Sequence, residues 1–299
     1  MAVSPDQILS VARTGDMQRL GIEREAVADA VRQFAKAGDA AAALELVGRT
    51  WRMWFTPAKL DEGSAVVASA LAIPRDSPVP VWEARALYAD GVFAFRAGDQ
   101  PRSRASNDMA LLVARQTGDV RGECDALTGL ARVALRDGRY SAVVTLARQA
   151  RERARAGGDD EAGAAPLHLE AAGTRLQRDY MAARELYLES LRMNTAAGNT
   201  AWVSMELHNL RWVELHLGNV EAAKAWFREL DSVSASDAFG EAWAELNWSA
   251  VAAAQGDLAE AQRRFTIGTR ALAKLAVTLD PDDQAELEWL REQVGARDL

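Results

Sequence analysis

The side chains best suited to chemistry in this sequence are its three histidines and its single cysteine. His208 and His216 are eight residues apart, so on a helix they share a face but lie too far apart to hold one ion alone. No His-Glu-x-x-His pattern and no cysteine pair accompanies them, and we expect no metal site. Cys124 could pair with a histidine as nucleophile and base, but a lone cysteine at a helix start is more often a small, half-buried side chain.

Motifs for phosphate and DNA are absent from the sequence. It contains no Gly-x-x-x-x-Gly-Lys-Ser/Thr loop, no strand-bound Gly-x-Gly-x-x-Gly and no basic recognition helix of a known type. Carboxylate pairs such as Asp282 and Asp283 stand at helix starts, where capping and the helix dipole account for them. We therefore expect no enzyme activity, no catalytic residues and no cofactor.

Composition narrows the class of protein and partner. The 299 residues are 49% hydrophobic and 26% charged, with only 8 prolines, which favours helices. A net charge of −8 disfavours generic nucleic-acid binding. Because one cysteine suits a reducing compartment, and neither a secretory signal nor a membrane-spanning run is visible, we expect a cytoplasmic protein that binds neither nucleic acid nor membrane.

An internal repeat predicts the elements that would position these residues. Short turns recur at Gly98, Gly138, Arg178, Gly218 and Gly256, at intervals of 40, 40, 40 and 38 residues. Glycine suits the end of a helix because it readily adopts positive φ, and the Asp or Asn that follows most of these turns can cap the next helix. The repeat therefore predicts helix pairs joined by tight turns.

Side-chain sizes repeat at fixed offsets from the turns. Small or modest side chains seven residues before a turn and five after it would let two antiparallel helices approach closely. Bulky side chains nine residues after a turn could fill the space against the next repeat. The small set is Gly91, Ala131, Ala171, Ser249, Ser103, Val143, Ala183, Ala223 and Ala261, and the bulky set is Tyr187, Phe227 and Phe265.

This spacing resembles the tetratricopeptide repeat, most clearly in Leu207–Leu230 and Ala244–Thr269. The longer period and the pattern of Arg24–Leu71 resemble the helical C-terminal region of large bacterial ATP-binding transcriptional regulators, without their ATPase or DNA-binding parts. The resemblance implies an all-α fold, a TPR-like right-handed superhelix (α-solenoid) of about five to six helix pairs with a C-terminal capping helix. It also implies that the first helices of the pairs line a concave groove.

We expect one continuous domain over residues 1–299. The proline-containing segment Ile73–Val81 and the Gly-rich segment Ala156–Pro166 are too short for interdomain linkers and are expected to join repeats. Residues 1–22 would cap the N-terminal end and residues 23–275 would form the repeats. Residues 280–295 would form the C-terminal cap, because Asp280-Pro281 is a favourable helix start.

Helical periodicity projects one set of side chains from the first helix of each pair into the groove. Arginine forms bidentate hydrogen bonds with carboxylates, and exposed Arg and Trp side chains are typical binding anchors. This set of residues therefore predicts a partner with an acidic and an apolar portion. The alternative is that the tryptophans pack between repeats and the arginines pair with neighbouring acids. The predicted groove residues are Arg85, Tyr88, Arg132, Arg136, His168, Arg175, Met205, His208, Trp212 and Trp243.

Two asparagines match a position with a known role in the family. Asn209 and Asn247 lie nine residues before their turns, where the asparagine of tetratricopeptide repeats often holds the backbone of a bound peptide. The resemblance implies the same role for these two residues. Other repeats have Ala89, Gly129 and Leu169 there, so the role would not extend along the whole groove.

The leading functional hypothesis is a regulatory or scaffold protein that binds a peptide or partner protein in its groove. A second hypothesis is a small-molecule sensor with an aromatic and arginine pocket near Trp212. A third is an enzyme or accessory factor whose site carries no known motif. The oligomeric state stays open, because an exposed aromatic face could also support a dimer.

Overall fold

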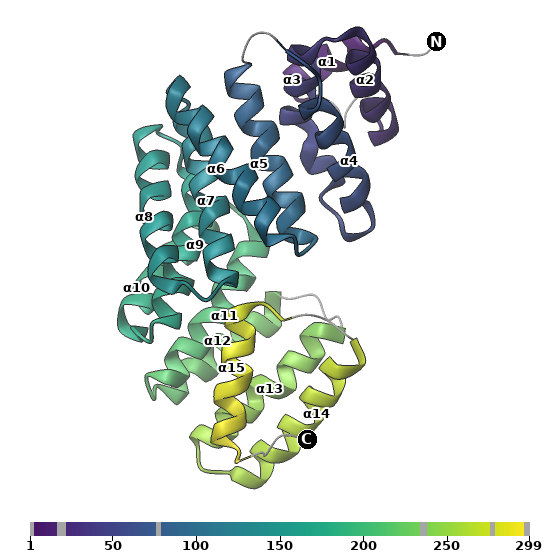
Figure 1. The fold of residues 1–299 in the computed structure, drawn as a ribbon. Helices are drawn as coiled ribbons and strands as arrows, with labels where there is room; N and C mark the ends of the chain where they lie inside the picture. The colour runs from purple at the N-terminus through teal and green to yellow at the C-terminus, as the bar shows by residue number, and fades with distance from the viewer. Residues whose placement is uncertain (1–2, 17–21, 76–78, 234–237, 276–278, 296–299) are drawn as a thin grey trace. The chain divides into compact units, whose positions relative to one another are not determined.

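The computed structural model describes residues 3–16, 22–75, 79–233, 238–275 and 279–295. Over these residues the chain forms fifteen α-helices, two short 3-10 helices and no strand. None of the described helices is long and apolar enough to cross a bilayer. The elements, shown in Figure 1, are α1 (Pro5–Thr14), α2 (Arg24–Ala37), α3 (Ala40–Thr50), η1 (Trp51–Trp54), η2 (Pro57–Lys59), α4 (Leu60–Leu71), α5 (Pro80–Arg96), α6 (Gln100–Thr117), α7 (Val120–Arg136), α8 (Tyr140–Ala156), α9 (Asp160–Leu176), α10 (Tyr180–Ala196), α11 (Thr200–His216), α12 (Val220–Val233), α13 (Ala238–Ala254), α14 (Leu258–Leu275) and α15 (Pro281–Gln293).

Helices α5 to α14 form successive pairs joined by the predicted turns. Gly98, Gly138, Gly218 and Gly256 each have a positive φ, between 70° and 83°. Arg178 occupies the same position between α9 and α10 with φ 65°, a conformation that crowds the Cβ of an ordinary residue. The turn spacing in the sequence therefore locates these helix ends correctly.

Caps and small side chains close the pairs as expected. The carboxylates of Asp99 and Asp179 accept hydrogen bonds from backbone N–H groups of the following helix, at 3.1 Å each. Between α5 and α6, Ser103 Oγ donates to the carbonyl of Gly91 at 2.8 Å. Between α13 and α14, Ser249 Oγ donates to the Ala261 carbonyl at 2.6 Å. In these two pairs, the small serine side chains thus bond directly to the backbone of the partner helix.

One connection is shorter than the segment predicted for it. The segment Ala156–Pro166 joins α8 to α9 as expected, but the turn itself is confined to the residues around Gly157 and Gly158, and α9 begins at Asp160. Pro166 lies inside α9. Glycines 118, 158 and 198 end the second helices at the same 40-residue spacing, all with positive φ. Each repeat therefore contains two turns with a positive-φ residue, one within the helix pair and one after it.

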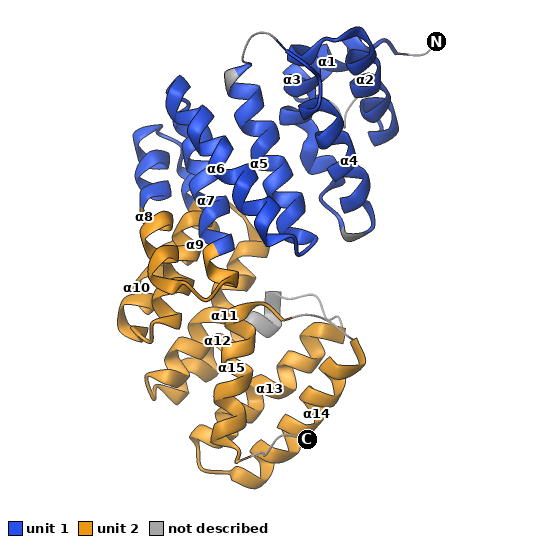
Figure 2. Cartoon of the chain, viewed as in Figure 1, with its two compact units in different colours: residues 1–133, 149–163 blue, residues 134–148, 164–299 orange. Residues whose placement is uncertain are grey.

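The chain divides into two compact units (Figure 2). Unit 1 comprises residues 1–133 and 149–163, and unit 2 comprises residues 134–148 and 164–299. In unit 1, α1 packs on α2 and α3 and buries Ile8 and Leu9, while residues 17–21 of the predicted N-terminal cap lie outside the described part. The expectation of one continuous domain stays a prediction.

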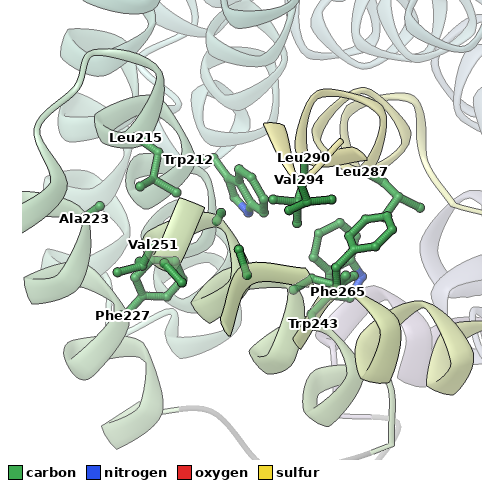
Figure 3. Close-up of a cluster of buried hydrophobic side chains, with 14 of the residues drawn as sticks. Trp212, Leu215, Ala223, Phe227, Trp243, Val251, Phe265, Leu287, Leu290 and Val294 are labelled. Atoms are coloured by element: carbon green, nitrogen blue, oxygen red, sulfur yellow. The ribbon is translucent and has the colours of Figure 1, made fainter. Parts of the chain in front are cut away.

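Unit 2 has a core to which its last helix contributes. Trp212 of α11, Trp243 of α13 and Phe265 of α14 are buried together with Leu290 and Val294 from α15 and its end. Figure 3 shows these side chains converging between the helices. The residues predicted to form a C-terminal cap therefore do form a helix, and it lies against the first helices of the preceding pairs.

Candidate functional site

All of the residues predicted to line a groove lie on the first helices of the pairs, here named A helices: α5, α7, α9, α11 and α13. The second helices, α6, α8, α10, α12 and α14, are named B helices. The A helices of unit 1 and of unit 2 present different surroundings to these residues, and each unit is described by its own contacts.

In unit 1, arginines surround a group of aromatic rings. Trp51 of η1 makes edge contacts with Phe55 and with Tyr88 of α5, with ring centroids 5.9 Å apart in both pairs. The guanidinium of Arg52 lies 4.4 Å over the Trp51 ring. Arg132 of α7 donates a hydrogen bond to Tyr88 Oη at 3.2 Å. Aromatic faces attract and orient guanidinium groups, so these arginines are held in place.

Two further arginines complete this surface. Arg96 lies 5.5 Å over the Phe55 ring, and Arg85 lies 4.9 Å over the Trp82 ring. We name the surface the arginine–aromatic cluster, with the members Arg52, Arg85, Arg96, Arg132, Trp51, Phe55, Trp82 and Tyr88.

The arginine–aromatic cluster contains four arginines and no acidic residue among its members. Within the described residues, none of its four arginines forms an ion pair with a carboxylate. The nearby Asp125 pairs instead with Arg121, 3.1 Å away. Burial raises the pKa of Asp125, which Arg121, Arg52 and Arg85 oppose. Moreover, Arg85 Nε is buried without a hydrogen-bond partner in the described structure.

In unit 2 the predicted arginines do have carboxylate partners, and these come from α15 and its start. The buried Arg175 donates through Nη1 to Glu286 at 2.9 Å and through Nη2 to Asp282 at 3.1 Å. Arg136 lies 3.6 Å from Asp280. Glu286 also contacts His216 Nε2 at 2.6 Å. The acids on one helix thus match the cations on several A helices.

His208 faces the same helix. Arg211 donates to its Nδ1, which leaves Nε2 directed at Asp283, 3.5 Å away. Burial holds the pKa of His208 well below its usual value, and Arg211 and Arg175 lower it further. Burial also raises the pKa of Asp283 to about 6, partly offset by Arg175. A neutral imidazole and a carboxyl that resists ionisation therefore meet at this contact.

The tryptophans of unit 2 do not line an open groove, contrary to the prediction. Trp212 and Trp243 are fully or almost fully buried and meet edge-on, with ring centroids 6.2 Å apart. Trp289 of α15 lies edge-on to Trp212 at 6.0 Å, and Leu290 packs into the same cluster. The physical reason is that α15 covers this part of the A helices.

His168 belongs to an internal network. Its Nδ1 contacts both carboxylate oxygens of Glu206, at 3.0 and 3.1 Å, and Ser190 donates to the same carboxylate at 2.6 Å. Glu206 is fully buried. A buried carboxylate requires such partners, so His168 fixes the packing of α9 on α11 rather than presenting itself to a ligand.

The asparagine clamp suggested by the resemblance is also corrected. Asn209 is buried and donates to the carbonyl of Met205 on its own helix at 3.1 Å. Asn247 is buried as well, at 3% exposure. Met205 is the exposed member of the set, at 44%. The two amides therefore lie inside the helix packing rather than on an open groove.

Cys124 is a packed thiol. It is buried, and its Sγ donates to the carbonyl of Ala162 at 3.6 Å. Burial raises the pKa of this thiol to about 11, so the thiol form persists at neutral pH. No group of three or more His, Cys, Asp or Glu suited to a metal ion occurs among the described residues.

Comparisons with known proteins bear on the fold. No protein-family model matches the chain, and neither does any curated protein. Among solved structures, the apo form of RapI is 12% identical and covers 89% of this chain and 98% of its own, with a TM-score of 0.62. NprR in complex with its cognate peptide NprX is 13% identical and covers 96% and 80%, with a TM-score of 0.62. A tetratricopeptide repeat protein from Parabacteroides merdae is 11% identical and covers 96% and 98%, with a TM-score of 0.55.

These likenesses span nearly all of the chain and confirm the predicted all-α fold of tetratricopeptide-like helix pairs. Sequence reasoning brought Arg85, Tyr88 and Arg132 together correctly, since all lie in the arginine–aromatic cluster. It missed Arg52 and Trp51, although the run Trp-Arg-Met-Trp at residues 51–54 shows an arginine beside an aromatic pair.

Proposed function

We propose that this protein is a binding module in which the A helices receive an acidic segment of a peptide or partner protein. The observation that carries the proposal is the arginine–aromatic cluster of unit 1. Its four guanidinium groups are held against rings and a phenol, yet none is paired with a carboxylate within the described residues. Preoriented arginines lose little freedom on binding, and Arg with aromatic neighbours is the typical composition of a binding hot spot.

The contacts of unit 2 support the same chemistry. There, A-helix cations are engaged by carboxylates of α15, and its Leu290 and Trp289 cover apolar A-helix residues. The sequence predicted a partner with an acidic and an apolar portion, and α15 has both portions. Within unit 2, this protein thus provides its own example of what an A-helix surface accepts.

The structural neighbours add support from their own ligands. NprR was solved with its cognate peptide NprX, and a Rap protein with a TM-score of 0.58 was solved with the Competence and Sporulation Factor. We infer by analogy a regulatory or scaffold role in the cytoplasm, without nucleic-acid binding or catalysis. The closer relationship to ATP-binding transcriptional regulators suggested by Arg24–Leu71 stays part of this proposal.

The small-molecule alternative is less well supported. A sensor was expected to have an enclosed pocket beside Trp212, but Trp289, Leu290 and Val294 occupy that side of the ring. A metabolite would have to displace these side chains before it could contact Trp212. A protein or peptide ligand needs no such pocket, because it can bind along the arginine–aromatic cluster of unit 1.

The test is affinity capture from the native cell with charge-reversed variants. Wild type should retain a stoichiometric protein partner, and Arg52→Glu/Arg132→Glu should lose it while keeping its helical circular dichroism. The matched control is Arg155→Glu/Arg192→Glu, which makes the same charge change at exposed positions of the B helices α8 and α10. Equal capture by all three proteins would exclude the arginine–aromatic cluster as the binding surface.

A further inference from the structure

Helix α15 and its N-cap residue Asp280 present a row of acidic side chains to the A helices of unit 2. Each acidic side chain lies near a cation or an imidazole. Asp280 lies near Arg136, Asp282 near Arg175 and Asp283 near His208. Glu286, one turn further on, contacts both Arg175 and His216. The recipients are spread over α7, α9 and α11, so α15 crosses several A helices instead of stacking only on the last pair. We name Arg136, Arg175, His208, Trp212, His216 and Trp243 the α15-binding face.

The apolar side of α15 continues the same contact. Leu290 and Val294 are almost completely buried and Leu287 is 9% exposed. Trp289 lies edge-on to His216 with ring centroids 4.6 Å apart, and His216 stacks on Tyr180 at 4.3 Å. Figure 3 shows Trp212 facing Leu290 and Val294. The helix therefore presents an acidic first turn followed by an apolar stripe, the pattern of a helix that docks in a groove.

As a segment, α15 has its own start and stop signals. Pro281 stands at its first turn with Asp282 and Asp283, which favour the positive end of the helix dipole. Gly295, with φ 65°, follows its C-terminal end. Only residues 276–280 separate α15 from α14. Its other side, including Gln284, Glu288 and Glu292, is exposed. It is thus built like a tethered ligand.

Several contacts of α15 contribute little net free energy to its docking on the A helices. The Arg175–Glu286 pair is buried, and burying two charges removes most of what their attraction gains. Within the described residues, the indole N–H groups of Trp212 and Trp243 have no hydrogen-bond partner beneath α15. These contacts determine the position of α15 but add little to the free energy of its docking. The indole N–H groups of Trp212 and Trp243 are donors that a different occupant could satisfy.

We propose that α15 is an exchangeable occupant of the α15-binding face, and that an acidic amphipathic helix of the partner, separate from the segment that contacts the arginine–aromatic cluster, binds there in its place. This inference rests on the proposed function, whose partner it narrows to a chemical class. The partner helix would carry carboxylates in its first turn and one turn later, at the spacing of Asp282 and Glu286. Leucine or aromatic side chains would follow at the spacing of Leu287 and Leu290.

The competing interpretation is that α15 is a permanent cap. A permanent cap would shield the buried tryptophans in every state of the protein, and its removal would unfold unit 2. An exchangeable occupant would leave a folded chain behind and would bind again when supplied separately. The two interpretations therefore predict opposite behaviour after the tether is cut.

The experiment cuts the tether in the full-length chain. A protease site is inserted between Leu275 and Leu279, the protein is cleaved, and α15 is removed by gel filtration. The probe is a fluorescein-labelled synthetic peptide of residues 279–295. We expect the cleaved chain to keep its remaining helical content and to bind the peptide in a one-to-one complex. The uncut chain should bind it at least about tenfold more weakly, because tethered α15 competes at a high effective concentration.

Matched controls make each outcome decisive. A peptide carrying Asp282→Lys and Glu286→Lys should not bind, whereas one carrying Glu288→Lys, on the exposed side, should bind like the original. If α15 never separates, if the cleaved chain unfolds when it does, or if cut and uncut chains bind the peptide equally, the exchange is excluded. The captured partner should also displace the labelled peptide from the cleaved chain, and failure to do so would assign it another surface.

The two proposals fail independently. If Arg52→Glu/Arg132→Glu loses the partner but no peptide exchange is seen, the proposed binding module is supported and the exchangeable helix is excluded. If the peptide exchanges but Arg52→Glu/Arg132→Glu captures the partner like wild type, the exchangeable helix is supported and the arginine–aromatic cluster is excluded as the partner site.

Discussion

Arg175 of α9 and Glu286 of α15 form a buried ion pair, with Nη1 and Oε1 2.9 Å apart, across 111 residues of sequence. Each residue is only 3% exposed. Glu286 uses its second oxygen to contact His216 Nε2 at 2.6 Å. This carboxylate therefore joins three helices, and it fixes the position of α15 on the A helices of unit 2.

Glu286→Gln should destabilise the docking of α15. The substitution keeps the shape of the side chain but leaves the Arg175 charge buried with less compensation, which costs about 3 kcal/mol in comparable buried pairs. Urea unfolding followed by tryptophan fluorescence would report the loss. Glu288→Gln on the exposed side of the same helix should change the unfolding free energy by less than about 0.5 kcal/mol. Equal effects of the two variants would mean that the ion pair does not hold α15.

Asp283 should make the stability of unit 2 depend on pH. Its pKa is raised to about 6 in the folded chain, so the folded state favours the protonated carboxyl. The contribution of Asp283 is therefore fully present below the unfolded pKa, near 4, and is lost as the pH rises through 6. Asp283→Asn should stabilise the protein at pH 8, by up to about 3 kcal/mol, and have little effect near pH 4.

Thermal unfolding of wild type and Asp283→Asn at both pH values checks this. His208 contacts Asp283, but burial lowers the pKa of His208, so it is neutral at pH 8, where the two proteins are expected to differ. A stabilisation that is the same at pH 4 and pH 8 would contradict the assignment to the Asp283 carboxyl.

Gly129→Ala should destabilise unit 1 through a single neighbour. A Cβ at Gly129 would lie 2.0 Å from Oδ1 of Asn107, which is buried between Gly91 and Gly129. Overpacking of this kind costs about 1–3 kcal/mol, more than the helix propensity gained by alanine. Combining it with Asn107→Ala should recover part of the loss in denaturant unfolding.

Gly163→Ala is the matched control for that substitution. Its Cβ would meet only the Ala154 methyl at 3.7 Å, an ordinary contact. Alanine should there stabilise α9 by up to about 1 kcal/mol. If both substitutions were neutral or both stabilising, the contact between Asn107 and Gly129 would not be as close as described.

Local patterns were sufficient to predict the helix pairs. Glycine at a 40-residue spacing marks helix ends because few other residues adopt positive φ, and the small residues at Gly91 and Ser103 meet as their offsets required. Helix periodicity places Arg85 and Tyr88 on one face of α5, and the repeat offset from the turn places Arg132 on the equivalent face of α7.

What the sequence did not predict depends on contacts between distant segments. The burial of Trp212 and Trp243 follows from where α15 lies, and no local pattern states that residues 281–293 will return to α9 and α11. Arg211 shows the same limit. It stands seven residues before the Gly218 turn, where the other repeats have small side chains, and it is buried over the Phe227 ring at 4.9 Å. The sequence predicted a partner with an acidic and an apolar portion, and it did not predict that α15 of this chain combines both and packs on α9 and α11.

The most direct test of the central claim, that the A helices carry the binding surface, is photo-crosslinking in the native cell. A p-benzoylphenylalanine replaces Phe55, which is 43% exposed in the arginine–aromatic cluster, or Leu112, which is 49% exposed on the B helix α6. We predict a crosslinked partner at position 55 and none at position 112. A partner captured at position 112 and not at 55 would contradict the account.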